Sequence, residues 1–171
     1  MSQVETGWAD MAARVVRVIL ARKGMGYAEL AAALQSVGVI ENERSLALRV
    51  TRGRVKLPML LQILHVTHST MPRLWLDAIA YRGSWESRAA LALAAELSRH
   101  PALSVDDLTL RMVELGASLS EKTLAAHISQ GTISLPEFLQ CILALGSPSL
   151  DRYIDYDDLI ATGRAAVAGR S

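Results

Sequence analysis

The sequence repeats itself at an interval of 78 residues. The segment that starts at Gly26 aligns without a gap with the segment that starts at Ser104, and 11 of the 51 aligned positions from residue 26 to residue 76 are identical. About three or four identities are expected by chance from ordinary residue frequencies. The repeat therefore predicts two units with one fold, residues 1–82 and residues 83–171, in place of one domain of average size.

Each unit is expected to consist of helices alone. The sequence lacks the alternating apolar and polar runs, bounded by hairpin turns, that indicate strands. A first helix is predicted over residues 8–23, because Met11, Val15 and Ile19 recur on one helical face. Gly24 follows at the position where a left-handed glycine commonly ends a helix.

Three further helices of each unit are predicted from their end signals. The second helix opens at a capping-box spacing and is closed by a glycine, the third begins at an N-cap residue and stops at a glycine, and the fourth carries proline in its first turn. These signals are Gly26–Glu29 with Gly38, Asn42 with Gly53, and Pro58 in the first unit, and Ser104–Asp107 with Gly116, Ser120 with Gly131, and Pro136 in the second.

The remaining boundaries follow from turn residues. Ser134 and Glu137 stand at the spacing of a further capping box. A fifth helix is expected after Pro72, its counterpart is expected after Pro148, and residues 81–84 are the expected boundary between the units. The small-residue tail from Thr162 onward is expected to fray. The fold class predicted is all-α, with two similar five-helix units in tandem.

Taken over the whole chain, the net charge of +1 argues against a dedicated nucleic-acid binder, but the charge is unevenly distributed. Residues 1–78 carry a net charge of +4 and residues 79–171 a net charge of −3. Five basic residues lie between residues 42 and 56, against one acidic residue, Glu43. The first unit is therefore basic and the second neutral to acidic, so that the total conceals a local positive segment.

The run YAELAAAL, followed by a glycine turn and SLALRVTRGRVKLPMLLQIL, resembles the helix-turn-helix core of lambda-repressor-like domains. More closely, the chain is similar to an uncharacterised family of bacterial helical domains that occur singly or in tandem. The resemblance covers about residues 8–80 and, more weakly, residues 86–155. It implies that the third helix of a unit is a recognition helix. The connection over residues 35–41 is longer than the usual repressor-type turn.

An α-helix fits the major groove of B-DNA, and exposed side chains near its N-terminus reach base edges. If Leu46 and Val50 face the core, the third helix exposes residues that suit base contact, namely Arg44, Ser45 and Arg49. Contacts to phosphate are expected at and beyond the helix end, from Arg52, Arg54 and Lys56, since Arg and Lys both bind phosphate. Free N–H groups near Tyr27, at the start of the second helix, are a further phosphate site.

The second unit has a weaker set of candidates. Lys122, Thr123, His127 and Gln130 occupy the corresponding helix, and only Lys122 is a fixed positive charge. An interaction or spacer role is favoured for this unit over DNA contact, and within the DNA-binding hypothesis it would brace the first unit, dimerise or bind a neighbouring stretch. Tandem units allow a monomer to span two adjacent groove segments, and a homodimer to bind a near-palindromic site.

No motif for catalysis, cofactor binding or metal binding is found, so the chain is not expected to be an enzyme or to need a cofactor. The single cysteine, the lack of an apolar run long enough to cross a bilayer and the acidic N-terminus favour a cytoplasmic protein without a membrane partner. The function predicted is sequence-specific binding of double-stranded DNA in transcription regulation. The alternative is a protein-interaction adaptor that binds RNA polymerase or another regulator without reading DNA.

Overall fold

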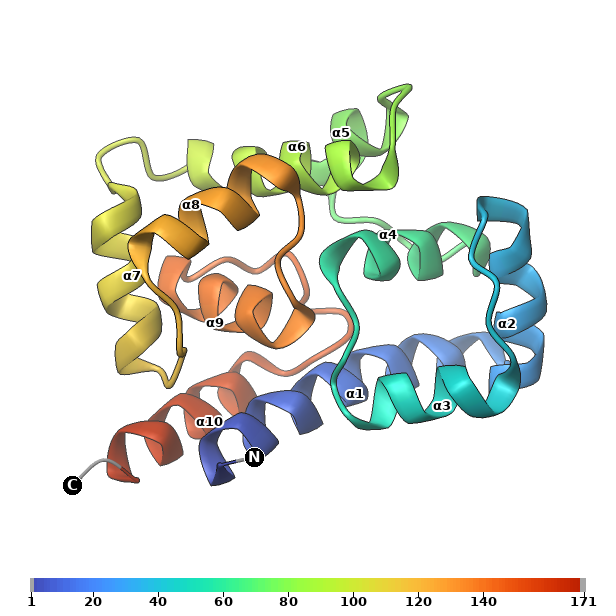
Figure 1. Cartoon of the computed structure of the whole chain (residues 1–171), viewed down its shortest axis with the longest axis horizontal. Coiled ribbons are helices and arrows are strands. Elements are labelled where there is room, and N and C mark those ends of the chain that lie inside the picture. Colours follow the sequence, from blue (N-terminus) through green and yellow to red (C-terminus); the bar gives the residue numbers. More distant parts are fainter. Residues whose placement is uncertain (1, 170–171) are drawn as a thin grey trace.

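The computed structural model describes residues 2–169, which form ten α-helices, two short 3₁₀ helices and no strand (Figure 1). The first repeat contributes α1 (Gln3–Lys23), α2 (Tyr27–Leu34), α3 (Glu43–Thr51), α4 (Leu57–Val66) and α5 (Leu76–Ala80), with η1 (Gln35–Val37) and η2 (Arg73–Trp75). The second contributes α6 (Trp85–Ser98), α7 (Val105–Glu114), α8 (Glu121–Gln130), α9 (Leu135–Leu145) and α10 (Tyr156–Ala168). The all-α prediction is confirmed.

The end signals in the sequence act as expected at most helix termini. The Asn42 side chain accepts a hydrogen bond from the Ser45 N–H at 2.8 Å, and the Ser120 hydroxyl accepts one from the Thr123 N–H at 3.2 Å. Gly131 ends α8 in the left-handed conformation with φ of 68°. Each interaction satisfies backbone groups that have no partner within their own helix.

Some predicted boundaries are wrong. Helix α1 begins at Gln3 and not at residue 8, because Ser2 and Glu5 form a reciprocal capping box before the apolar stripe starts. At α9, the Ser134 hydroxyl accepts from the Glu137 N–H at 3.2 Å, but Glu137 Oε2 is buried without a hydrogen-bond partner, so the second half of that capping box is missing.

The C-terminal helix also differs from the expectation. Turns follow Pro148, and α10 begins only at Tyr156. The frayed tail predicted from Thr162 onward is helical as far as Ala168, and its last two residues, 170 and 171, lie outside the described part of the chain. Its small residues are contact residues, since a Cβ atom on Gly163 would lie 2.9 Å from Leu115 Cδ2 and 3.0 Å from Leu143 Cδ2. Small side chains here allow α10 to pack closely against its neighbours.

The two repeats are interleaved. Helix α1 packs against α9 and α10 of the second repeat, and α6, its counterpart, packs against α4 and α5 of the first. Figure 1 shows α1 beside α10 along the lower edge and α6 above α4. The first helix of each repeat thus covers the fourth helix of the other.

An approximate internal twofold relates the repeats. The Leu57 N–H donates to the Ile133 carbonyl at 2.9 Å, and the Leu135 N–H donates to the Val55 carbonyl at 2.7 Å. Positions 55 and 57 correspond to positions 133 and 135 in the repeat. Equivalent segments therefore pair with each other in an antiparallel sense, as a twofold axis between Lys56 and Ser134 requires.

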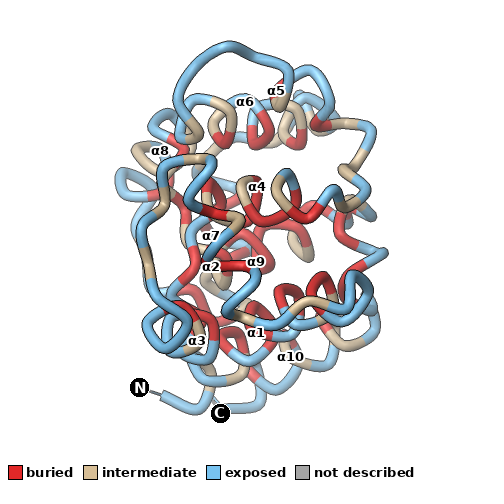
Figure 2. Tube along the Cα trace, turned by 90° about the vertical axis from the view of Figure 1, so that its right-hand side faces the viewer, coloured by how far each residue is buried: buried red, intermediate tan, exposed pale blue. Residues whose placement is uncertain are grey.

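Buried side chains from both repeats form one continuous core. Figure 2 shows the buried residues on the inward sides of the helices and the exposed residues on the outer turns. Trp8 and Trp75 are buried, and the Trp8 indole N–H donates to the Leu115 carbonyl of the other repeat at 2.7 Å. Within residues 2–169, no helix combines the length and the apolar character that crossing a membrane requires.

Candidate nucleic-acid interface

Helix α3 presents one charged side to solvent because its other side is part of the core. Leu46 and Val50 are fully buried. Gly53 follows the helix in the left-handed conformation, with φ of 64°, and lies against the backbone of Ala9 on α1. A Cβ atom on Gly53 would lie only 2.7 Å from Ala9 Cα. The close approach at Gly53 fixes the rotation of α3, and with it the residues that remain exposed.

The predicted contact residues of the first repeat lie mostly on one surface. A hollow of about 420 Å³ on α3 brings together Arg44, Ser45, Arg49, Arg52 and Arg54, with Asn42 and Leu48. All five predicted residues are exposed. Arg44, Leu48 and Arg52 are spaced four apart, so they lie on one stripe of the helix. Lys56 is exposed as well, just beyond this hollow.

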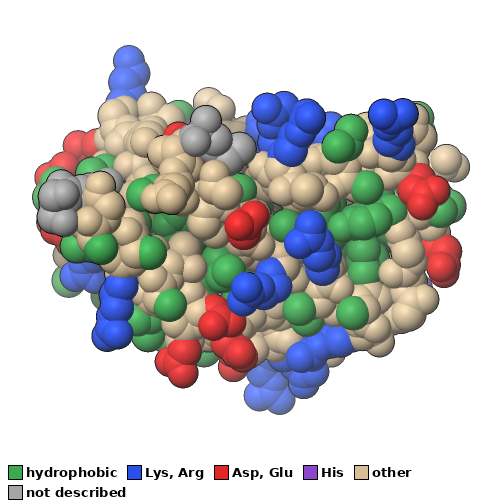
Figure 3. All heavy atoms as spheres, turned by 90° about the horizontal axis from the view of Figure 1, so that it is seen from below, with side chains coloured by type: hydrophobic (Ala, Val, Ile, Leu, Met, Phe, Trp, Pro, Cys, Tyr) green, Lys and Arg blue, Asp and Glu red, His purple; other side chains and the backbone are tan. Residues whose placement is uncertain are grey.

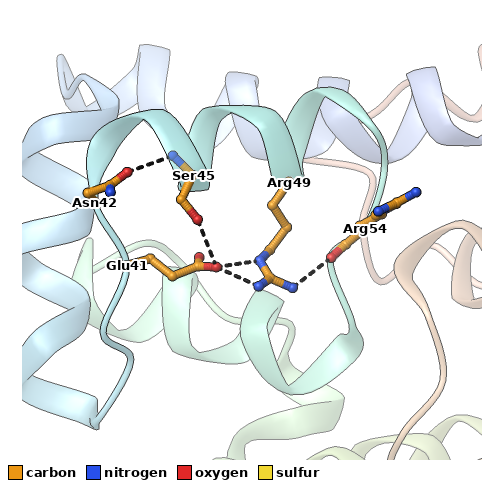
Figure 4. Close-up of polar contacts among 5 residues, drawn as sticks. All are labelled: Glu41, Asn42, Ser45, Arg49 and Arg54. Atoms are coloured by element: carbon orange, nitrogen blue, oxygen red, sulfur yellow. Dashed lines mark hydrogen bonds and ion pairs between the residues drawn. The ribbon is translucent and has the colours of Figure 1, made fainter.

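Arg49 differs from the other cations of this surface because it is already paired. Its Nη2 and Nε atoms lie 2.5 Å and 2.8 Å from Glu41 Oε1, and its Nη1 donates to the Arg54 carbonyl at 3.5 Å (Figure 4). The Ser45 hydroxyl is 3.5 Å from the same carboxylate oxygen. The Glu41 side chain is only 12% exposed, so solvent screens this pair less than it would screen two exposed groups.

Glu41 is the residue of this surface that the sequence prediction missed. It lies in the connection before α3, eight residues from Arg49, outside the i,i+3 and i,i+4 spacings at which helical side chains meet. Its Oε2 atom is buried without a hydrogen-bond partner among the described residues. The connection predicted to be longer than a repressor-type turn is the segment that carries this carboxylate.

Tyr27 lies outside the α3 hollow. It is half-buried at the start of α2, and its hydroxyl oxygen is buried without a hydrogen-bond partner in residues 2–169. The Gly26 N–H donates to Glu29 Oε1 at 3.4 Å, and the Leu30 N–H is the first in α2 with a helical partner, Gly26. The N–H groups in between remain available to an anion, as expected for the first turn of a helix.

Arg52 and Arg54 also line a second hollow, of about 360 Å³, between the repeats. Glu5 and Glu137 line the same hollow. Arg52 and Arg54 therefore line two hollows, the cationic one on α3 and a second one that also contains carboxylates. Figure 3 shows the same mixture over the lower face, with Lys and Arg side chains along its upper edge and middle and Asp and Glu side chains among them and toward both ends.

Helix α8, which corresponds to α3 in the second repeat, carries few charged residues. Lys122, Thr123 and Gln130 are exposed on α8, and His127 is half-buried, with its Nδ1 atom 2.8 Å from Thr132 Oγ1. The hydroxyls of Ser120 and Thr123 are 3.0 Å apart. The structure thus places the four second-unit candidates on one helix, with His127 and Thr123 already engaged in local hydrogen bonds.

Two exposed apolar side chains lie beside the cationic stripe. Ile40 is 80% exposed in the connection before α3, and Leu48 is 44% exposed within the stripe. Among residues 2–169, no three His, Cys, Asp or Glu side chains come together in a way that could hold a metal ion.

A model of the family described as "Domain of unknown function (DUF6471)" matches residues 8–71 and, a second time, residues 85–150. The two matches coincide with the two copies of the internal repeat. Neither the curated proteins nor the solved structures contain a match to the chain.

Proposed function

The chain belongs to the DUF6471 family and carries its domain twice, and we propose that it is a sequence-specific DNA-binding protein that regulates transcription. The observation that carries this proposal is the set of unpaired cations on α3 and just after it. Arg44, Arg52, Arg54 and Lys56 are exposed, and none of their side chains makes a hydrogen bond or ion pair with another residue in the described range 2–169. Unpaired guanidinium groups gathered on one surface, with a further unpaired ammonium group at Lys56, favour a polyanionic partner.

In this proposal α3 enters the major groove. Helices α2 and α3 pack against each other, as the two helices of a helix-turn-helix unit do. Arg44, in the first turn, contacts base edges, and Leu48 contacts a thymine methyl group. Arg52, Arg54 and Lys56 bind phosphates, and the free N–H groups near Tyr27 bind a further phosphate at the start of α2.

The pairing of Arg49 with Glu41 changes what is proposed for that residue. A guanidinium held by a carboxylate on two of its nitrogens is a poor partner for guanine, because the existing ion pair must break first. We therefore place Arg49, with Ser45, in the support of the α3 surface and give direct base contact to Arg44.

The second repeat has a supporting role in the proposal. Helix α8 corresponds to α3 about the internal twofold, but Lys122, Thr123, His127 and Gln130 offer one fixed charge in place of the cluster on α3. This repeat braces α1, which packs on both α3 and α9. In addition, it could contact a second segment of the DNA groove or form the contact between two copies of the chain in a homodimer.

Selection of bound duplexes from a random pool tests the proposal. The full chain is expected to enrich one sequence family, and Arg44→Ala is expected to relax the preference at one or two base pairs, a loss of about 1–3 kcal/mol of discrimination. Lys122→Ala on α8 is the matched control and is expected to leave the preference unchanged. Enrichment of no sequence, or equal relaxation by both variants, contradicts the proposal.

Ile40 and Leu48 support a second candidate, an adaptor that binds RNA polymerase or another regulator through the same surface. Exposed apolar residues beside charges are typical of protein interfaces. In this case the chain binds purified RNA polymerase without DNA, and Ile40→Ser with Leu48→Ser abolishes the complex. If instead the double variant binds polymerase as well as the original chain does, the adaptor is excluded at this surface.

A further inference from the structure

A pocket of about 910 Å³ lies where the two repeats meet, apart from the α3 surface. Its wall is built from three segments: residues 70–74 around η2, residues 96–100 at the end of α6, and residues 145–153 after α9. Its volume is in the range of pockets that enclose small molecules, about 300–1,000 Å³. None of these segments belongs to the proposed DNA surface.

Each of the three segments contributes an arginine to the pocket wall: Arg73, Arg99 and Arg152. All three are exposed, and within residues 2–169 none of their side chains has a hydrogen-bond or ion-pair partner. The acidic residues in the wall are Asp151 and Glu96. Three guanidinium groups against these two carboxylates leave the pocket wall with a formal charge of +1, His100 being counted as neutral, which favours an anion over a cation.

The Glu96 carboxylate forms no ion pair with these arginines, and its hydrogen bonds come from neutral donors. The residue is 1% exposed on α6, and it accepts hydrogen bonds from the Trp75 indole N–H at 2.9 Å, from the Ser147 hydroxyl at 2.7 Å and from the Ser149 hydroxyl. These donors belong to the segments that carry Arg73 and Arg152. The buried carboxylate therefore holds the two arginine-bearing segments at fixed positions around the pocket.

Only the second repeat has a buried carboxylate at this position of its first helix. On the first helix of each repeat the buried positions correspond at an interval of 77 residues, one less than in the segment from Gly26 onward: Ala89, Ala92 and Leu93 on α6 match Ala12, Val15 and Val16 on α1. In this register Glu96 corresponds to Ile19. Ile19 is fully buried in the apolar core. A carboxylate with three hydrogen bonds thus occupies, beside the pocket, the position of an apolar core residue in the other repeat. Because the other repeat packs with isoleucine there, packing of the fold does not require the carboxylate.

We propose that this pocket binds a small anion that carries at least two negative charges on phosphate or carboxylate groups. The planar guanidinium fork suits both groups, since each offers two oxygens to its parallel N–H donors. Arg73, Arg99 and Arg152 bind the anion from three sides, and Glu96 is a positioning residue that acts through Trp75, Ser147 and Ser149. The site is independent of the DNA-binding proposal, because none of its residues belongs to α3.

Calorimetric titration of the full chain with pyrophosphate and, separately, with citrate tests the site and distinguishes phosphate from carboxylate chemistry. Both titrations are run without DNA at constant ionic strength. At least one probe is expected to bind with a Kd below about 1 mM. Arg73→Ala with Arg152→Ala is expected to raise that Kd at least tenfold.

Arg17→Ala with Arg164→Ala is the matched control, since it removes two exposed arginines from α1 and α10, outside the pocket. It is expected to change the Kd less than twofold. Thermal unfolding of both double variants checks that they remain folded. Absence of saturable binding by both probes, or equal weakening in the two double variants, overturns the proposal.

Discussion

Glu41 and Glu96 hold neighbouring side chains in place, and burial controls the chemistry of Cys141. Glu41 binds Arg49 and leaves the other cations of the α3 surface unpaired. Glu96 holds Trp75 and two serine hydroxyls inside the fold. Cys141, close enough to Glu96 to feel its charge, is buried on α9, and burial raises the pKa of its thiol to about 12.

The Cys141 thiol is therefore expected to be inert in the native chain. At pH 8 it should react with iodoacetamide only through unfolding, whereas the urea-unfolded chain reacts at once. Because the folded pKa lies above the unfolded value of about 9, the protonated thiol stabilises the fold below pH 9, and that contribution is lost as the pH rises from about 9 to 12. Equal alkylation rates with and without urea contradict the burial of this thiol.

At the scale of single helices, the sequence predicted what is local. The caps at Asn42 and Ser120, the glycine stops at Gly24 and Gly131 and the prolines in the first turns depend on neighbours in sequence, and the structure confirms them. The stop predicted at Gly38 is displaced, because α2 ends at Leu34 and Gly38 ends the 3₁₀ turn that follows. Periodicity also identified Leu46 and Val50 as the buried side of α3. It does not show what a buried side packs against, so the contact of α1 with α9 and the pairing of Glu41 with Arg49 required the structure.

Gly131 tests how closely the helices pack. A Cβ atom there would lie 1.9 Å from the Glu86 carbonyl oxygen on α6, at φ of 68°. Gly131→Ala is expected to lower the free energy of unfolding by about 2–4 kcal/mol, from left-handed strain together with the backbone clash. Urea denaturation followed by circular dichroism measures the loss.

Gly24→Ala is the matched control, because Gly24 ends α1 at φ of 60° with no atom within 4 Å of an added Cβ. Its expected cost is strain alone, about 1 kcal/mol. If both variants lose the same free energy, the contact of Gly131 with α6 does not exist as described.

At the scale of the whole molecule, the tandem repeat does not act as two independent domains joined by a linker. Residues 81–84 do separate α5 from α6, but α1 covers α9 and α6 covers α4. Trp8 donates to the Leu115 carbonyl, and Arg14 on α1 forms an ion pair with Asp158 on α10 at 2.8 Å. Each repeat thus completes the core of the other.

Fragments cut at the repeat boundary are expected to show this dependence. Residues 1–82 alone should lack a cooperative thermal transition, because α1 loses the helices that bury Trp8. Mixing this fragment with residues 83–171 should restore helical circular dichroism and a cooperative transition. A fragment 1–82 that unfolds cooperatively near the midpoint of the full chain contradicts the interleaved core.

The salt dependence of DNA binding is the most direct test that α3 and the residues after it bind DNA. For the full chain and its selected duplex, Arg52→Ala, Arg54→Ala and Lys56→Ala combined should reduce the slope of log K against log salt by about three units, since each phosphate contact contributes about 0.9. Arg17→Ala, Arg82→Ala and Arg164→Ala combined remove the same charge from exposed positions elsewhere and should leave the slope unchanged. Equal slopes for the two triple variants would contradict the account.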